Sequence, residues 1–324
     1  MGNNLKKITF NLLTTLLSVV IILGFLELIL KIKNKFIMNY DIEMWKYAKE
    51  LKVPHNNKKI NHIHKKDSKA KLQNVEIAIN SYGFREKNFK KKDWDNATEK
   101  IIFLGSSVTL GWGVKEEKNL TSLIEKIANS ENKNWKIINA AVGNYNTERY
   151  INNFFEFYER FDPDVIVVQY FINDAEVLDN KKGNFFTRNF HLGVELWKYI
   201  ALFNTKLGET NIQDHYKKVY KFEEQSKIVF NELKKLSNFC NKQKKNCYVI
   251  FTPDLKLFKR HDLNFIKDYM EKMSKELNFK FFDITNLFSN YDEDMITNIK
   301  FKDRHPNELA HEIMAKAIYN YLLN

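Results

Sequence analysis

The chain has 324 residues, which is enough for one large domain or two ordinary ones with a buried core. Its 44% hydrophobic and 14% aromatic content, with only 4 prolines and 10 glycines, excludes a disordered, collagen-like or low-complexity protein. Two cysteines exclude a disulfide-rich scaffold and a four-thiolate zinc site. The net charge of +12 leaves nucleic acid and membrane surfaces as candidate partners.

The positive charge is concentrated at the N-terminal end. Residues 1–100 hold 20 Lys and Arg against 10 Asp and Glu, whereas residues 101–324 hold 32 against 30. A nucleic-acid-binding domain carries its basic residues on the folded body, interleaved with aromatic residues. We therefore expect no nucleic-acid partner, and we expect the basic segment to contact anionic lipid headgroups.

An uncharged apolar stretch lies near the N-terminus. Ile8 to Leu26 is 19 residues without a charge, and Leu28 to Leu30 extends it past Glu27. About 20 helical residues, at ~1.5 Å each, span the ~30 Å hydrocarbon core of a bilayer. The stretch exceeds the ~7–15 apolar residues of a cleaved signal peptide, and no Ala-x-Ala cleavage pattern follows it. The sequence predicts an uncleaved, single-pass transmembrane signal anchor within residues 1–32.

Lysines flank this stretch on both sides. Two precede it and five follow it within about 20 residues, namely Lys6 and Lys7, then Lys31, Lys33, Lys35, Lys46 and Lys49. Taken literally, the positive-inside rule puts the body of the chain in the cytoplasm. The function expected below favours the opposite side, so the sequence alone leaves the orientation open.

Residues 33–100 are rich in lysine and asparagine, with short apolar islands. Residues 75–79 alternate as a strand does, and residues 80–83 are a turn signal. We expect a basic membrane-proximal arm that packs in part on the body. His62 and His64 could share one face of a strand, but no third metal ligand accompanies them, so we expect a solvated loop and no metal site.

Five short apolar runs alternate with helical stretches over residues 101–324, which we expect to be the main domain. The runs are 101–104, 135–139, 165–171, 248–251 and 279–282, and the helical stretches lie near 118–130, 147–160, 215–244 and 307–322. Such alternation predicts an α/β fold, a three-layer α/β/α sandwich around a five-stranded parallel sheet. Ligands bind beyond the carboxyl ends of such strands, so the residues after each run are candidates for chemistry.

Three of these positions carry suitable side chains. The first run ends in Gly105-Ser106-Ser107, which fits neither a Walker nor a dinucleotide loop and is either a nucleophilic serine turn or a helix cap. Asn173 follows the third run, where its amide is either an oxyanion donor or a turn residue. Asp303 and His305 precede the last helix at a spacing that lets Asp303 orient the imidazole, leaving the other ring nitrogen as a base.

These segments resemble the sequence blocks of the SGNH/GDSL hydrolases. Residues 105–107 with Gly111 are similar to the Gly-Asp-Ser block, residues 139–147 to the second block, residues 171–174 to Gly-x-Asn-Asp, and residues 303–307 to the Asp–His block. Residues 80–85 resemble an Asn-x-x-Gly-Phe-Arg segment found upstream in many bacterial relatives. The resemblance covers residues 75–324 and implies the flavodoxin-like SGNH fold.

The resemblance also implies the site residues. The catalytic group would be Ser107, His305 and Asp303, and the oxyanion hole would use the N–H of Ser107, the N–H of either Gly143 or Asn144, and the amide of Asn173. It implies no cofactor and no metal. Ser106 stands where the family has Asp, and Phe171 replaces a glycine and should narrow the site beside Asn173.

The function expected from this resemblance is a serine esterase or acyl-transfer enzyme acting through an acyl-serine. Together with the anchor, it predicts O-acyl or O-acetyl esters of envelope polysaccharide or lipid as substrates, and an extracytoplasmic (periplasmic) catalytic body. Two alternatives stay open, a lysophospholipase or thioesterase at the membrane face and a non-catalytic carbohydrate-binding or assembly module. Cys240 and Cys247 are either a disulfide of an exported domain or a pair of free thiols.

Overall fold

The computed structural model describes residues 2–86, 88–178, 183–206, 212–221, 223–298, 303 and 305–323. The chain forms two compact units. One comprises Met1–Lys46 with Lys181–Glu209, and the other comprises Tyr47–Asn180 with Thr210–Asn324. These divisions differ from the sequence-based boundaries after residues 32 and 100, because residues 47–100 belong to the same unit as the expected main domain.

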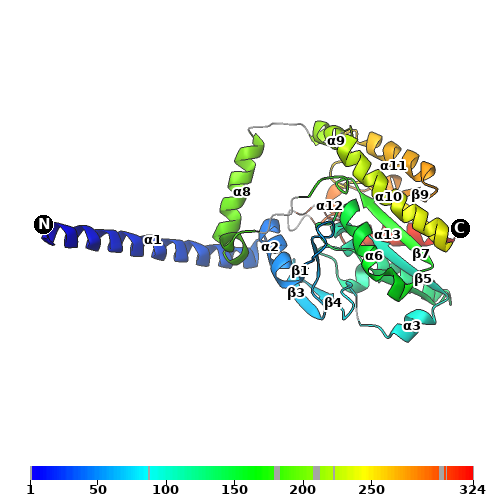
Figure 1. Cartoon of the computed structure of the whole chain (residues 1–324), viewed down its shortest axis with the longest axis horizontal. Helices are drawn as coiled ribbons and strands as arrows, with labels where there is room; N and C mark the ends of the chain where they lie inside the picture. The colour runs from blue at the N-terminus through cyan, green and yellow to red at the C-terminus, as the bar shows by residue number, and fades with distance from the viewer. Residues whose placement is uncertain are drawn as a thin grey trace. The chain divides into compact units, whose positions relative to one another are not determined.

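The first unit is helical. Its elements are α1 (Gly2–Phe36), the first residues of α2 (Tyr40–Glu50), α7 (Phe185–Asn189) and α8 (His191–Lys206) (Figure 1). The segment Asn4–Phe36 of α1 is long and apolar enough to cross a membrane, and almost all of its most apolar part is exposed. The predicted anchor is therefore one continuous helix that reaches Phe36.

The second unit opens with two antiparallel strand pairs. Strand β1 (Lys52–Pro54) pairs with β2 (His62–His64), and β3 (Ser68–Leu72) pairs with β4 (Val75–Ile79). The β3–β4 turn has two residues, Gln73 and Asn74, both with positive φ, as a type I′ hairpin turn requires. Strand β4 matches the strand predicted at residues 75–79.

The central sheet has five parallel strands in the order β6-β5-β7-β8-β9. They are β5 (Glu99–Leu104), β6 (Trp135–Asn139), β7 (Val165–Phe171), β8 (Asn246–Thr252) and β9 (Lys280–Asp283). Four of the strands contain one of the predicted apolar runs and β9 overlaps the fifth, at 279–282, so the predicted parallel sheet is confirmed. Because all strands run the same way, their carboxyl ends meet at one edge.

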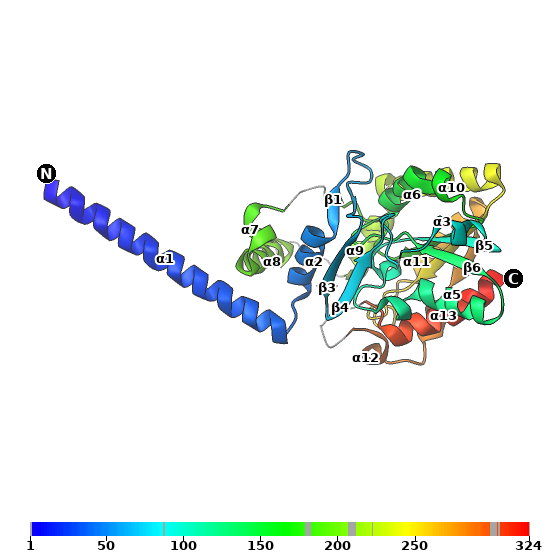
Figure 2. The same ribbon diagram turned by 90° about the horizontal axis from the view of Figure 1, so that it is seen from below.

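Helices cover both faces of this sheet, which makes the predicted three-layer sandwich. Figure 2 shows α6 (Thr147–Phe161) and α10 (Glu223–Gln243) on one side, with α5 (Leu120–Ser130) and α13 (Glu308–Leu323) on the other. Alternate residues of β5 separate into two buried clusters, Ile102 and Leu104 with α6 and α10, and Ile101 and Phe103 with α5 and α13. The remaining helices are α3 (Lys91–Asp95), α4 (Ser107–Leu110), α9 (Ile212–Lys221), α11 (Asn264–Glu276) and α12 (Glu293–Ile296), with 3₁₀ turns at Glu116–Lys118 and Thr285–Phe288.

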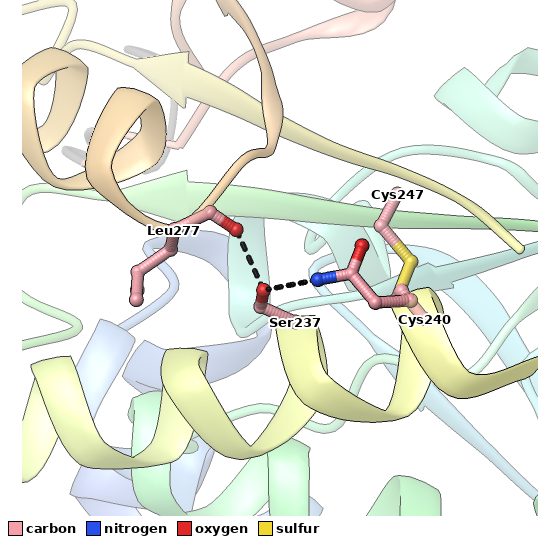
Figure 3. Close-up of a disulfide and its surroundings, with 5 residues drawn as sticks. Ser237, Cys240, Cys247 and Leu277 are labelled. Carbon is pink, nitrogen blue, oxygen red and sulfur yellow. Dashed lines mark hydrogen bonds between the residues drawn. A yellow bond between two sulfur atoms is a disulfide. The ribbon is translucent and has the colours of Figure 1, made fainter. Parts of the chain in front are cut away.

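The two cysteines form a disulfide between the end of α10 and the start of β8. Figure 3 shows Cys240 and Cys247 joined through their sulfurs, and their Cα atoms are 6.3 Å apart. One turn earlier, the Ser237 hydroxyl donates a 2.6 Å hydrogen bond to the carbonyl of Leu277. Of the two alternatives that the sequence left open, the structure has the disulfide.

Candidate active site

Ser107 lies at the carboxyl edge of the sheet, where β5 passes into the short helix α4. The turn requires glycine at position 105, since a Cβ there would lie 2.0 Å from Oγ1 of Thr109 and 3.0 Å from the carbonyl of Gln169. Gly111 ends α4 in a left-handed conformation. Two glycines thus fold the chain tightly around the helical turn that carries Ser107, whose side chain is half-buried.

Ser107, His305 and Asp303 form a hydrogen-bonded series. Nε2 of His305 lies 2.7 Å from Oγ of Ser107, and Nδ1 of His305 lies 2.6 Å from Oδ1 of Asp303. The backbone N–H of His305 donates to the same carboxylate oxygen at 3.1 Å. These three residues come from opposite ends of the main domain, and the structure brings them together as the sequence blocks imply.

Asp303 is buried and held from two sides. The side-chain amide of Gln73 donates to Oδ2, while His305 occupies Oδ1. Burial acts to raise the pKa of Asp303, but the charge of His305 and the hydrogen bonds from His305 and Gln73 outweigh it and lower this pKa below its usual value. The carboxylate is therefore ionised at neutral pH and suited to orient the imidazole and stabilise its cationic form.

Gly143, one of the two candidates for an oxyanion N–H, already has its peptide groups engaged. Its N–H donates to the hydroxyl of Tyr47 at 2.9 Å, and its carbonyl accepts from Nζ of Lys52 at 2.6 Å. A Cβ at this position would lie 2.7 Å from the Tyr47 ring. Asn144 follows it, exposed and left-handed with φ of 64°, and this geometry favours Asn144 over Gly143 as the second donor.

A buried relay supports this loop. Nδ1 of His64 lies 3.2 Å from the carbonyl of Gly83, which can only accept, so Nδ1 carries the ring proton. Nε2 of His64 then accepts from the hydroxyl of Tyr47 at 2.7 Å, and the Tyr47 oxygen in turn accepts from Gly143. Burial, reinforced by the charge of Lys52, lowers the pKa of His64 to about 3, so the ring stays neutral and the relay keeps its direction.

His62 and His64 do not lie in a solvated loop, and that expectation is wrong. Both are buried on β2, where Nε2 of His62 lies 3.3 Å from the carbonyl of Gly143. Contacts with distant residues account for this burial: the His62 carbonyl accepts from Tyr145, and His64 from Tyr47. No group of three or more His, Cys, Asp and Glu side chains suited to a metal occurs in the part of the chain that the structure describes.

Asn173, the third oxyanion candidate, is exposed just beyond β7. Its neighbour Asp174 is buried, accepts the N–H of Phe171 at 3.0 Å and, through its own carbonyl, receives the N–H and hydroxyl of Thr147. Phe171, expected to narrow the site, is partly buried and packs on the apolar cluster under α6 and α10. Asp174 thus ties the Asn173 turn to the start of α6.

Arg85 supports the turn that carries Ser107 from the upstream segment. It is fully buried, and its guanidinium donates to the carbonyls of Leu110 at the end of α4 and of Gly111 and Val114 beyond it. Burial lowers the pKa of Arg85 to about 10, which leaves it charged at neutral pH. In the sequence, Arg85 was indicated by the Gly-Phe-Arg segment at residues 83–85. No such motif indicated that Tyr47, Lys52 and Gln73 would contact this site.

A cavity lies beside the Asn144 and Asn173 turns. It is lined mainly by residues 146–149 and 174–178, with Lys58, Ile228 and Val229. Its walls carry side chains of both charges, and Ser107, His305 and Asp303 are not among its lining residues.

No family model matches the chain, and no curated protein has a matching sequence. Solved structures similar to it include the psychrotrophic esterase EstA from Pseudoalteromonas sp. (14% identity over 69% of this chain and 98% of that chain, TM-score 0.44). Another is a catalytic mutant of the acetylxylan esterase Axe2 from Geobacillus stearothermophilus (14% identity over 69% of this chain and 94% of that chain, TM-score 0.44). A third is a putative lipolytic protein of the G-D-S-L family from Desulfitobacterium hafniense DCB-2 (10% identity over 69% of this chain and 99% of that chain, TM-score 0.44). At these identities the likeness concerns the fold and says nothing of substrate.

Proposed function

We propose that this protein is a serine esterase or acyl transferase of the SGNH/GDSL type. The observation that carries the proposal is the hydrogen-bonded series from Ser107 through His305 to Asp303 at the carboxyl edge of the sheet. A hydroxyl, an imidazole and a buried carboxylate in this order are the arrangement that activates serine as a nucleophile. The four ordered sequence blocks support the same assignment.

The proposed reaction proceeds in two transfers. Nε2 of His305 takes the proton of Ser107 as Oγ bonds to the ester carbonyl carbon, and the same proton passes to the departing alcohol as its C–O bond breaks. A water or sugar hydroxyl then gives its proton to His305 as its oxygen bonds to the acyl carbon. His305 passes this proton to Oγ of Ser107 as the bond between Oγ and the acyl carbon breaks, which releases the acid or the new ester. Asp303 stays ionised throughout and holds the imidazole.

The oxyanion formed in each transfer needs donors at the same sheet edge. We assign these to the N–H of Ser107, the N–H of Asn144 and the side-chain amide of Asn173. The support for Asn144 is that the N–H of Gly143 is donated to Tyr47. Loss of one such donor typically costs about 10²–10³ in turnover.

Among possible substrates we favour short acyl esters of a hydroxyl-rich compound over long-chain lipids. The neighbouring cavity combines charged side chains such as Lys58 and Arg149 with apolar ones such as Leu178, a mixed lining that suits a sugar carrying a short acyl group. With α1 crossing the membrane, this makes O-acetylated envelope polysaccharide the favoured substrate class. The Cys240–Cys247 disulfide supports an extracytoplasmic body, because disulfides persist in oxidising compartments.

The test compares two adjacent serines. Ser107→Ala should abolish both hydrolysis of a short-chain aryl ester and covalent labelling by a fluorophosphonate probe. Ser106→Ala is the matched control, because Ser106 is buried beside the nucleophile and should leave labelling of Ser107 in place. Full labelling of Ser107→Ala would refute the assignment, and an unlabelled wild-type protein would favour a non-catalytic binding module.

A further inference from the structure

Helices α7 and α8 expose a cluster of large apolar side chains. The exposed fractions lie between 38% and 67% for Phe185, Phe186, Phe190, Leu196, Trp197, Tyr199 and Ile200. Scattered apolar residues are ordinary on a protein surface, but seven within sixteen positions, five of them aromatic, form a patch. Such a patch marks an interaction surface.

Helix α8 buries Val194 but leaves a second apolar side exposed. Leu196, Tyr199 and Ile200 share one side of the helix by their spacing, and this side is exposed. Two polar residues of α8 contact the segment at the start of α2 instead: Glu195 accepts from the amide of Asn39, and Lys198 pairs with Asp41 at 2.9 Å. An exposed apolar side, with these polar contacts made inside the unit, suits an apolar or interfacial surrounding.

Glu27 connects α8 to the apolar helix α1. Its two carboxylate oxygens accept the backbone N–H groups of His191 and Leu192, at 3.0 and 2.9 Å, so Glu27 caps the start of α8. Figures 1 and 2 both show α8 beside α1. Glu27 is also the residue that interrupts the apolar stretch, directly after its uncharged part ends at Leu26. With the uncharged residues 8–26 inside the hydrocarbon, this contact would place the start of α8 near its edge.

We propose that α7 and α8 form a second membrane contact, lying in the headgroup region of the bilayer that α1 crosses. Trp and Tyr concentrate at this level of membrane proteins, because their rings are apolar while their polar groups reach water, and Trp197 and Tyr199 fit that preference. The lipid bilayer is the occupant because Glu27 binds the start of α8, the helix that carries much of this patch, directly to the apolar helix α1. The proposal rests on the membrane anchor of the proposed function and does not depend on the esterase chemistry.

The experiment uses the full chain reconstituted into vesicles of phosphatidylcholine and phosphatidylglycerol. Tyr199→Cys is labelled with an environment-sensitive fluorophore, and Leu196→Cys provides a second position on the same side. Asn290→Cys, an exposed turn residue of the other unit, is the matched control. Lipids with a nitroxide near the headgroup should quench the fluorophore at 199 and 196, and lipids with a nitroxide at the chain end should quench it less.

Quenching at 199 and 196 no stronger than at 290, in a chain that resists alkaline carbonate extraction, would overturn the proposal while leaving the anchor intact. A chain that carbonate extracts would instead show that α1 does not anchor it and would overturn both. Fluorescence that is quenched by neighbouring labelled protein molecules, and not by nitroxide lipids, would overturn the proposal and assign the patch to self-association. Fluorophosphonate labelling of Ser107 in each variant reports separately on the catalytic unit.

Discussion

The side chain of Gln73 binds the carboxylate of Asp303, although 230 positions separate the two residues in the sequence. Gln73 sits at the tip of the β3–β4 hairpin in a left-handed conformation and is almost fully buried. Gly113 leaves the space for it, since a Cβ there would lie 2.4 Å from the Gln73 amide oxygen. The hairpin therefore completes the hydrogen bonding of the acid that orients His305.

Gln73→Ala should lower turnover by about ten- to a hundredfold, because a hydrogen bond to a charged group contributes about 1.5–3 kcal/mol. Gln73 positions Asp303 and does not reach the substrate in the proposed mechanism. The loss should therefore fall on kcat, with KM little changed, in steady-state hydrolysis of an aryl ester. Gln73→Glu should be at least as damaging, since it puts a second carboxylate against Asp303.

Lys69→Ala is the control on the same hairpin. Lys69 is exposed, and its ion pair with exposed Glu76 contributes little to stability. If Gln73→Ala keeps the wild-type kcat and Ser107 is still labelled by a fluorophosphonate, then Gln73 does not position Asp303 for the reaction.

Tyr47→Phe should weaken the loop that carries Asn144, the proposed second oxyanion donor. It removes the acceptor of the Gly143 N–H and the donor to His64, both buried. Leaving such groups unsatisfied costs about 1–3 kcal/mol, seen as a lower melting temperature. Turnover should also fall, by less than the ~10²–10³-fold of a donor lost outright. Tyr158→Phe removes a hydroxyl that donates to neighbouring Glu159 on the surface, and it should match wild type in both measurements. An equal effect of the two variants would contradict the role of Tyr47.

The sequence predicts the central sheet and the catalytic series for a physical reason. Runs such as residues 165–171 are apolar throughout because both faces of a parallel sheet are covered, so periodicity and composition alone locate them. Ser107, His305 and Asp303 follow from their place at strand ends and before the last helix. They occur in the same order as in the sequence blocks that this chain resembles. Predicting them therefore requires no knowledge of which distant segments touch.

The supporting residues could not be predicted in this way. Tyr47, Lys52 and Gln73 lie in a lysine-rich segment whose composition is typical of an exposed arm, and nothing local marks them as buried. Their roles depend on which loop of the main domain the strand pairs meet, which is a tertiary property. The same limit applies to Glu27. The sequence gives no reason for a single acidic residue in this apolar stretch, and the structure supplies one, because Glu27 accepts a backbone N–H at the start of α8.

The Cys240–Cys247 disulfide should be present in protein isolated from cells. Replacing both cysteines by alanine should cost about 2–3 kcal/mol, the loop-closure contribution for a sequence separation of seven. The denatured, unreduced wild type should show no reactive thiol, and two should appear after reduction. Two reactive thiols before reduction would mean that the catalytic unit folds in a reducing compartment, against the proposed extracytoplasmic location.

Asp174 should make the protein less stable as the pH rises through the neutral range. Burial raises the pKa of Asp174 from 3.8 to about 8, and the hydrogen bonds from Phe171 and Ser106 only partly oppose this. Below pH ~4 the folded and unfolded chains both hold the proton. Between pH ~4 and ~8 only the folded chain keeps it, so the free energy of unfolding falls as the pH rises, and above this window the loss is complete.

Asp174→Asn tests this because the amide oxygen can still accept the Phe171 N–H but cannot ionise. Urea unfolding across this pH window should show a flatter dependence for the variant, which should be more stable than wild type at its upper end. Each unit of pKa difference corresponds to about 1.4 kcal/mol, so the gain should reach a few kcal/mol. Asp294→Asn, an exposed carboxylate, should leave the pH dependence of unfolding as in wild type. An unchanged slope in Asp174→Asn would mean that the Asp174 carboxyl is ionised in the folded protein, and that the Asn173 turn is held by a charge.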